Sequence, residues 1–159
     1  MAETIAVRRL TFTIFALVLA LVVAACGKTP ADSVSGAAAP GTPQDFSVNV
    51  GDRVFFTVDS ADINPTAAGV LARQAQWLNQ YPRYTIVVEG HADERGTREY
   101  NIALSARRAN ATRNYLVSQG VSSSRIRVTS FGKERPVAVC DAEQCWSQNR
   151  RAVTVLSSS

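Results

Sequence analysis

The fold is decided by the stretch Tyr84-Thr-Ile-Val-Val-Glu-Gly90, the turn His91-Ala-Asp-Glu-Arg-Gly96, and the alanine-rich run that starts at Arg98. The first part has a β-branched apolar centre, which predicts a strand. The last part is expected to form a helix to about Gln119, with Gly120 just beyond its C-cap. A strand, a glycine-flanked turn and a long helix are therefore expected in direct succession.

Three further apolar runs are expected to be strands, at 53–58, 126–131 and 152–156. A first helix is expected to start at Asn64-Pro65, because Asn can cap a helix and Pro suits its first position, and to end before Pro82. The order strand, helix, strand, helix, strand, strand predicts an α/β (α+β) sandwich with helices on one face. The residues expected to face the core are Ala68, Leu71, Ala75 and Leu78 in the first helix, and Ile102, Ala106, Ala109 and Leu116 in the second.

Residues 1–25 are typical of an export signal that is removed, with a basic start and an uncharged run shorter than the roughly 20 residues that cross a bilayer. Val23-Ala-Ala-Cys26 resembles a bacterial lipobox, which implies lipid on the Cys26 thiol; the alternative is a plain signal peptide with a chance cysteine. Gly27 resembles the pattern that sends such proteins to the outer membrane. Residues 26–45 are rich in Pro, Gly, Ala and Ser, and are expected to be a flexible linker before a folded domain at 46–159.

Composition and cysteine usage narrow the function classes. The chain has 159 residues, which suits one domain plus short extras, and a formal net charge of +4 with no run of five basic residues, so nucleic acid is not an expected partner. Cys140 and Cys145 precede the last strand and are expected to pair as a disulfide in an exported protein. A zinc site is not expected, because the chain has a single histidine. A redox role is not expected either, because the spacing of the two cysteines is not Cys-x-x-Cys.

Charged side chains flank the turn after the clearest strand. Asp93 lies in that turn, and Asn101, Leu104 and Arg108 are spaced by three and four, so they share one helix face. A guanidinium can bind a carboxylate with two parallel hydrogen bonds, a carboxylate accepts from an ammonium, and free N–H groups around Thr97 can hold a further carboxylate. The alternative is structural: Asp93 caps the turn, and Arg108 is a solvated charge paired with it or with its neighbour.

The segments Glu89–Gly96 and Asn101–Ala109 closely resemble the signature of the OmpA-like peptidoglycan-binding domain, as found in peptidoglycan-associated lipoproteins. The resemblance extends over about residues 53–156 and implies a βαβαββ domain with a mixed four-stranded sheet and helices packed on one face. It also implies that Asp93 and Arg108 grip diaminopimelate, which carries an ammonium and a carboxylate on one carbon.

A weaker part of the resemblance lies in Val54–Ile63, which is similar to a first-strand motif in which an aromatic residue and an Asp border the pocket. Asp59 is the corresponding acid and a second-tier site residue. Val58 stands where the aromatic residue is usual, and Thr57 also departs from the pattern, so a looser pocket wall is expected there. His91 is expected to be a polar residue at a strand end, and the Arg150-Arg151 pair to be structural.

The resemblance implies a non-catalytic tether between the outer membrane and peptidoglycan, with its domain in the periplasm. It also implies membership of the Tol–Pal system, with TolB as the partner and TolA as a further candidate. The alternatives are a wall-modifying enzyme and an OmpA-like module of another envelope assembly. The sequence has no Gly-x-Ser-x-Gly, and its adjacent acids in the turn fit acid–base work poorly, so no enzyme activity, cofactor or metal is expected.

Overall fold

The computed structural model describes residues 38–158. The predicted signal at 1–25, lipidation at Cys26 and most of the linker lie outside the described residues. None of the helices within 38–158 is long and apolar enough to cross a membrane. The elements, in chain order, are α2 (Pro43–Asp45), η2 (Phe46–Gly51), β1 (Arg53–Phe55), α3 (Pro65–Gln80), β2 (Tyr84–Gly90), α4 (Arg98–Ser118), η3 (Ser123–Arg125), β3 (Ile126–Ser130), α5 (Glu143–Asn149) and β4 (Arg151–Ser158).

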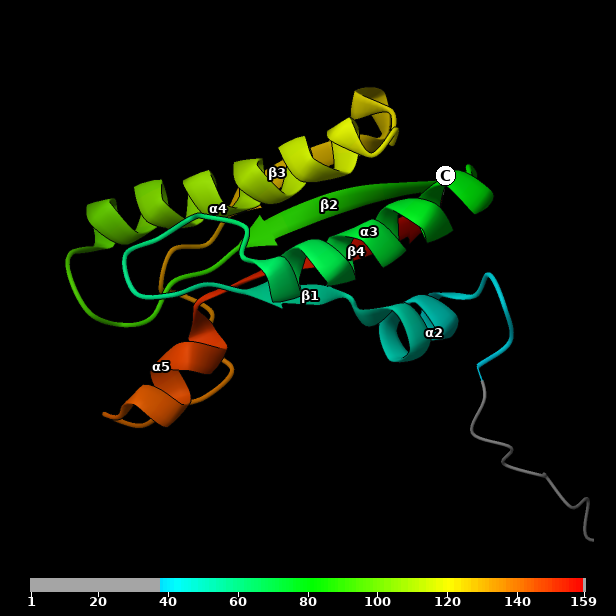
Figure 1. Ribbon diagram of the computed structural model, residues 1–159. Helices are drawn as coiled ribbons and strands as arrows, with labels where there is room; N and C mark the ends of the chain where they lie inside the picture. The colour runs from blue at the N-terminus through cyan, green and yellow to red at the C-terminus, as the bar shows by residue number, and fades with distance from the viewer. Residues whose placement is uncertain (1–37, 159) are drawn as a thin grey trace, which may run out of the picture. The chain divides into compact units, whose positions relative to one another are not determined.

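The four strands form one mixed sheet in the order β1-β4-β2-β3, which confirms the expected fold class. β2 and β3 run parallel, so the long helix α4 serves as their crossover, while β4 is antiparallel to both of its neighbours. Figure 1 shows α3 and α4 side by side on one face of the sheet, with α5 beyond the end at which β2 finishes. The turn after β2 therefore lies between the start of α4 and α5.

Helix α3 follows the sequence closely. The Asn64 side chain caps it by accepting from the Ala67 N–H, Pro65 occupies the first turn, and the helix ends two residues before Pro82. Leu71, Ala75 and Leu78 are buried as expected, and Ala68 is partly buried.

Helix α4 also has nearly the expected bounds, but its buried face differs from the prediction. Ile102 is exposed and Ala106 is only partly buried, while Ala109 and Leu116 are fully buried. The remaining buried positions are mostly polar, because this helix faces backbone groups of other segments as well as apolar side chains. The buried residues of α4 are Asn101, Leu104, Ser105, Arg108, Ala109, Thr112 and Leu116.

The predicted boundary between linker and domain lies a few residues too late. Residues 41–45 are already packed on the domain: the Asp45 carboxylate accepts from the Gly41 N–H at 2.8 Å and from Trp77 Nε1 at 2.7 Å. The Gly41 carbonyl in turn accepts from the Tyr84 hydroxyl at 3.0 Å. Composition suggested a tether here, but one buried carboxylate fixes the segment on the core.

Two further elements differ from the sequence prediction. β1 ends at Phe55 rather than at Val58, because the chain turns at Asp59, whose φ of 54° is in the left-handed region. The short helix α5 stands where a connection was expected, and the expected disulfide between Cys140 and Cys145 closes at its start, with a Cα–Cα distance of 5.7 Å.

Candidate functional site

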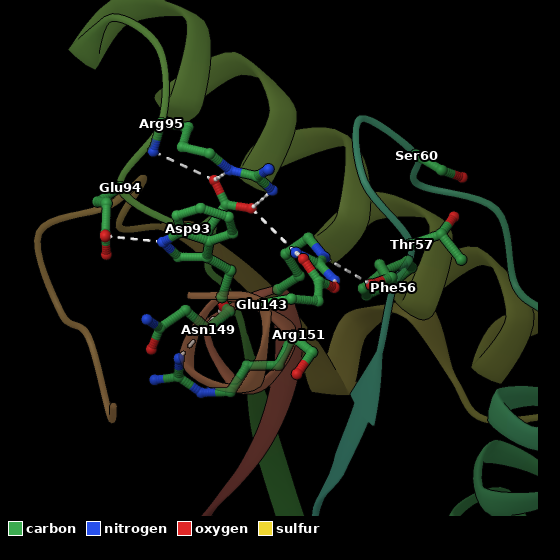
Figure 2. Close-up of polar contacts among 12 residues, drawn as sticks. Phe56, Thr57, Ser60, Asp93, Glu94, Arg95, Glu143, Asn149 and Arg151 are labelled. Carbon is green, nitrogen blue, oxygen red and sulfur yellow. Dashed lines mark hydrogen bonds and ion pairs between the residues drawn. The ribbon is translucent and has the colours of Figure 1, made fainter. Parts of the chain in front are cut away.

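Asp93 lies in the turn between β2 and α4, where Gly96 has a φ of +87° that favours glycine. Its carboxylate accepts from Arg95 three times, at 3.2 Å from the backbone N–H, 3.3 Å from Nε and 2.6 Å from Nη2 (Figure 2). Arg150 Nη1 donates to the same carboxylate at 3.2 Å. Burial opposes the charge, but these hydrogen bonds hold the pKa of Asp93 below its ordinary value.

Arg108 is completely buried and extends from the middle of α4 to three backbone carbonyls. It donates from Nε to Ser60 at 2.8 Å, from Nη1 to His91 at 2.9 Å and from Nη2 to Thr57 at 3.1 Å. Its guanidinium also lies 5.3 Å from the ring centroid of Phe56. The alternative of a solvated charge paired with a carboxylate is therefore wrong, since Arg108 bonds neither Asp93 nor Glu94.

The charge of Arg108 is retained despite this burial. Burial lowers its pKa to about 10, the Asp93 carboxylate acts in the opposite direction, and Arg150 adds to the lowering. Arg108 is therefore a cation at neutral pH. A guanidinium has five N–H groups, and three are bonded to carbonyls, so one N–H on each terminal nitrogen is left for another acceptor.

A cavity of about 280 Å³ opens between the turn, the start of α4 and the segment after β1. It brings together most of the residues singled out from the sequence, along with several that were not. Its lining residues are Val58, Asp59, Asp93, Arg95, Gly96, Tyr100, Asn101, Leu104 and Arg108.

The helix residues expected at the site take different positions around the cavity. Asn101 is buried and donates from Nδ2 to the Arg95 carbonyl at 2.8 Å, so it fixes the turn. Leu104 supplies an apolar wall. Thr97 is the N-cap of α4 and accepts from the Tyr100 N–H at 3.2 Å, but it does not line the cavity.

Asp59 stands on the opposite wall, next to Val58. The Tyr100 hydroxyl donates to the Asp59 carboxylate and so joins the first segment to the first turn of α4. A non-glycine residue with positive φ is uncommon, and here it directs the chain so that Asp59 and Val58 border the cavity. The aromatic group missing at position 58 has a counterpart in Tyr100, which sequence spacing did not single out.

Helix α5 and the residue after it hold the turn between β2 and α4 in place, a role that was not predicted. Arg150 Nε donates to the Phe56 carbonyl at 3.1 Å, and its guanidinium pairs with Glu143 as well as with Asp93. Trp146 Nε1 donates to Glu94 Oε1 at 2.7 Å. The structural reading of Arg150 is therefore too narrow, because this side chain also holds the carboxylate of the candidate site.

His91, which directly follows β2, is buried under Phe131, with ring centroids 5.5 Å apart. Neither ring nitrogen has a hydrogen-bond partner within residues 38–158. Burial, followed by the charges of Arg151 and Arg135, lowers the pKa of His91 to about 4. The ring is therefore neutral at pH 7, and its backbone carbonyl, not its imidazole, contacts Arg108.

Comparison with known proteins identifies the family of this chain. The OmpA family model matches residues 55–151. A peptidoglycan-associated lipoprotein of Mesorhizobium japonicum is 63% identical over 150 residues, covering 89% of each chain, and one of Rhizobium meliloti is 61% identical over 149 residues, covering 89% of this chain and 85% of its own. The crystal structure of the peptidoglycan-associated lipoprotein from Burkholderia pseudomallei superposes with a TM-score of 0.69 at 37% identity, over 73% of this chain and all of that one. The chain therefore belongs to the peptidoglycan-associated lipoproteins and carries the OmpA-family domain that they share.

Proposed function

We propose that this protein binds peptidoglycan non-covalently through diaminopimelate in the stem peptides, and so tethers the outer membrane to the wall. The observation that carries the proposal is that Asp93 and Arg108 both line one cavity of about 280 Å³. A ligand carbon that bears both an ammonium and a carboxylate can place the first on Asp93 and the second on the two remaining N–H groups of Arg108. Asn101, Leu104 and Asp59 complete the walls, and Thr97 presents the start of α4.

The anchor is the second part of the proposal. Cys26 carries the lipid, residues 1–25 are removed, and the segment that follows gives the domain its reach below the outer membrane. The relatives named peptidoglycan-associated lipoprotein match over most of their own length, which favours this arrangement over a module of another assembly. In this role the protein belongs to the Tol–Pal system that supports envelope integrity and cell division, with TolB as a partner and TolA as a further candidate.

A binding role suits the site better than catalysis. The pKa of the Asp93 carboxylate in the cavity is lowered, which makes this group a poor proton donor at neutral pH. The buried His91 nearby has a pKa of about 4, which makes it a weak base at neutral pH. Release of soluble muropeptides from sacculi by the pure protein would contradict this part of the proposal.

Binding to purified sacculi tests the site directly. Asp93→Asn and Arg108→Lys keep side-chain size while removing the charge in one case and the planar fork in the other, so each is expected to weaken binding at least about tenfold. Arg107→Lys, on the exposed neighbour of Arg108, is the matched control and is expected to bind as the parent does. Folded Asp93→Asn and Arg108→Lys variants that bind as tightly as the parent would show that the site is assigned wrongly.

A further inference from the structure

The hydrogen-bond acceptor positions of the Asp93 carboxylate are already occupied by donors of the protein itself. Its two oxygens accept four hydrogen bonds, three from Arg95 and one from Arg150. A carboxylate offers about four acceptor positions. A ligand ammonium therefore binds Asp93 only if one of these donors leaves.

The four donors differ in how firmly they are held. Arg150 has a side chain only 5% exposed, and it also bonds the Phe56 carbonyl and pairs with Glu143. The Arg95 backbone N–H is fixed by the turn. The Arg95 guanidinium is 39% exposed and lines the cavity, and its hydrogen bonds within residues 38–158 go only to Asp93. It is the donor that can leave.

A second contact holds the Arg95 guanidinium at the rim of the cavity. Arg95 lies 4.1 Å from the ring centroid of Trp146, and this ring is held in place by the hydrogen bond of its Nε1 to Glu94. A cation over an indole face is attracted to it, so rotation away from Asp93 keeps the charge at the rim of the cavity.

We propose that Arg95 determines the specificity of this site by acting as the resident cation of Asp93. The inference rests on the proposed function and adds a mechanism to it. Before binding, Arg95 pairs with Asp93; after binding, the ligand ammonium pairs with Asp93, and the ligand carboxylate pairs with the displaced Arg95 as well as with Arg108. The charges of Asp93 and Arg95 therefore each have a partner of opposite sign in both states.

The exchange of Arg95 for a ligand ammonium distinguishes ligands by whether the carbon that bears the ammonium also bears a carboxylate. Diaminopimelate carries a carboxylate on the carbon that bears its second ammonium, so it satisfies Arg95 after displacing it. Lysine at the same place in a stem peptide carries the ammonium alone, and leaves Arg95 without a carboxylate partner. The site is therefore expected to reject lysine-type peptides through Arg95.

The test compares two synthetic tripeptides, L-Ala-γ-D-Glu-meso-diaminopimelate and its L-lysine analogue, titrated by NMR into the full-length protein in detergent. The variant is Arg95→Gln, and the matched control is Arg98→Gln. Arg98 lies three residues further along, has a side chain 69% exposed and pairs with Glu134, so the control removes the same charge near the site without touching Asp93.

In Arg95→Gln, the lysine peptide is expected to bind more tightly, and the preference for diaminopimelate over lysine is expected to fall by about tenfold, the effect of one charged hydrogen-bonded contact. The preference of Arg98→Gln should equal that of the parent. An unchanged or larger preference in Arg95→Gln overturns the exchange while leaving the proposed function intact, provided that the parent binds the diaminopimelate peptide. A parent that binds neither peptide overturns the proposed function and the exchange with it.

Discussion

Replacement of Arg108 by methionine should destabilise the whole domain as well as the site. Methionine keeps most of the length and the apolar stem of arginine but removes every donor. The carbonyls of Thr57, Ser60 and His91 then lose the partner that joins the segment after β1 to the end of β2. Arg108 thus connects α4 to the segment after β1 and to the residue that follows β2.

The magnitude follows from the burial of each bond. The bond to His91 is buried and those to Thr57 and Ser60 are partly buried, so the first acceptor is expected to cost about 2 kcal/mol when left unpaired and the others about 1 kcal/mol each. Removing a desolvated charge offsets part of this. We expect a net loss of about 3 kcal/mol, against a total stability of about 5–15 kcal/mol for a typical domain.

Urea unfolding followed by tryptophan fluorescence measures the change, because Trp77 is buried in the core. Arg107→Met, on the exposed face of α4, is the control and should change stability by less than about 0.5 kcal/mol. The midpoint for Arg108→Met should fall with an unchanged slope. A loss within about 1 kcal/mol of the control would refute the view that these three carbonyl bonds hold the domain together.

Three other predictions concern the scaffold. Gly90→Ala places a Cβ against the backbone of α4 and should cost more than about 2 kcal/mol, whereas Gly69→Ala, at a helix position with open space, should stabilise by about 0.5–1 kcal/mol; equal midpoints in urea would contradict this contrast. Loss of the disulfide by Cys140→Ser with Cys145→Ser should cost about 2 kcal/mol in thermal unfolding, the entropy of a short loop, and a variant as stable as the parent would show that the clip is dispensable. Burial lowers the pKa of His91 from 6.5 in the unfolded chain to about 4 in the folded domain. As the pH falls, the unfolded chain therefore protonates His91 first, and the folded domain loses stability between pH 6.5 and about pH 4. The loss should reach about 2 kcal/mol at pH 5, and His91→Phe should flatten the pH dependence of unfolding between pH 7 and pH 5.

Local signals predicted the elements that local interactions specify. The β-branched run of β2, the Asn64-Pro65 start of α3 and the glycine after α4 fixed those bounds within a residue or two. The ends of β1 and the linker depended on single contacts with distant residues, such as Asp45 with Trp77, and no periodicity reports such contacts. Helix α5 is short and lacks a side-chain N-cap, so its sequence carries no start signal.

The candidate site was reached through its motif, and the buried face of α4 explains why periodicity did not reach it. An apolar stripe through Ile102 and Ala106 was predicted, but the face toward the sheet instead carries polar groups that bond the turn and the segment after β1. Patterning reads such a face as solvent-exposed.

The buried polar residues of α4 therefore belong both to the core and to the candidate site. A loss of peptidoglycan binding in an Arg108 variant could come either from unfolding of the domain or from loss of a ligand contact. Arg95 resolves this ambiguity, because its partly exposed guanidinium hydrogen-bonds only Asp93 within residues 38–158 and adds one cation–π contact with Trp146. Its substitution should alter ligand preference while the free energy of unfolding changes by less than about 1 kcal/mol, as is usual for an exposed ion pair. A preference that changes at constant stability would assign the effect to the cavity rather than to the fold.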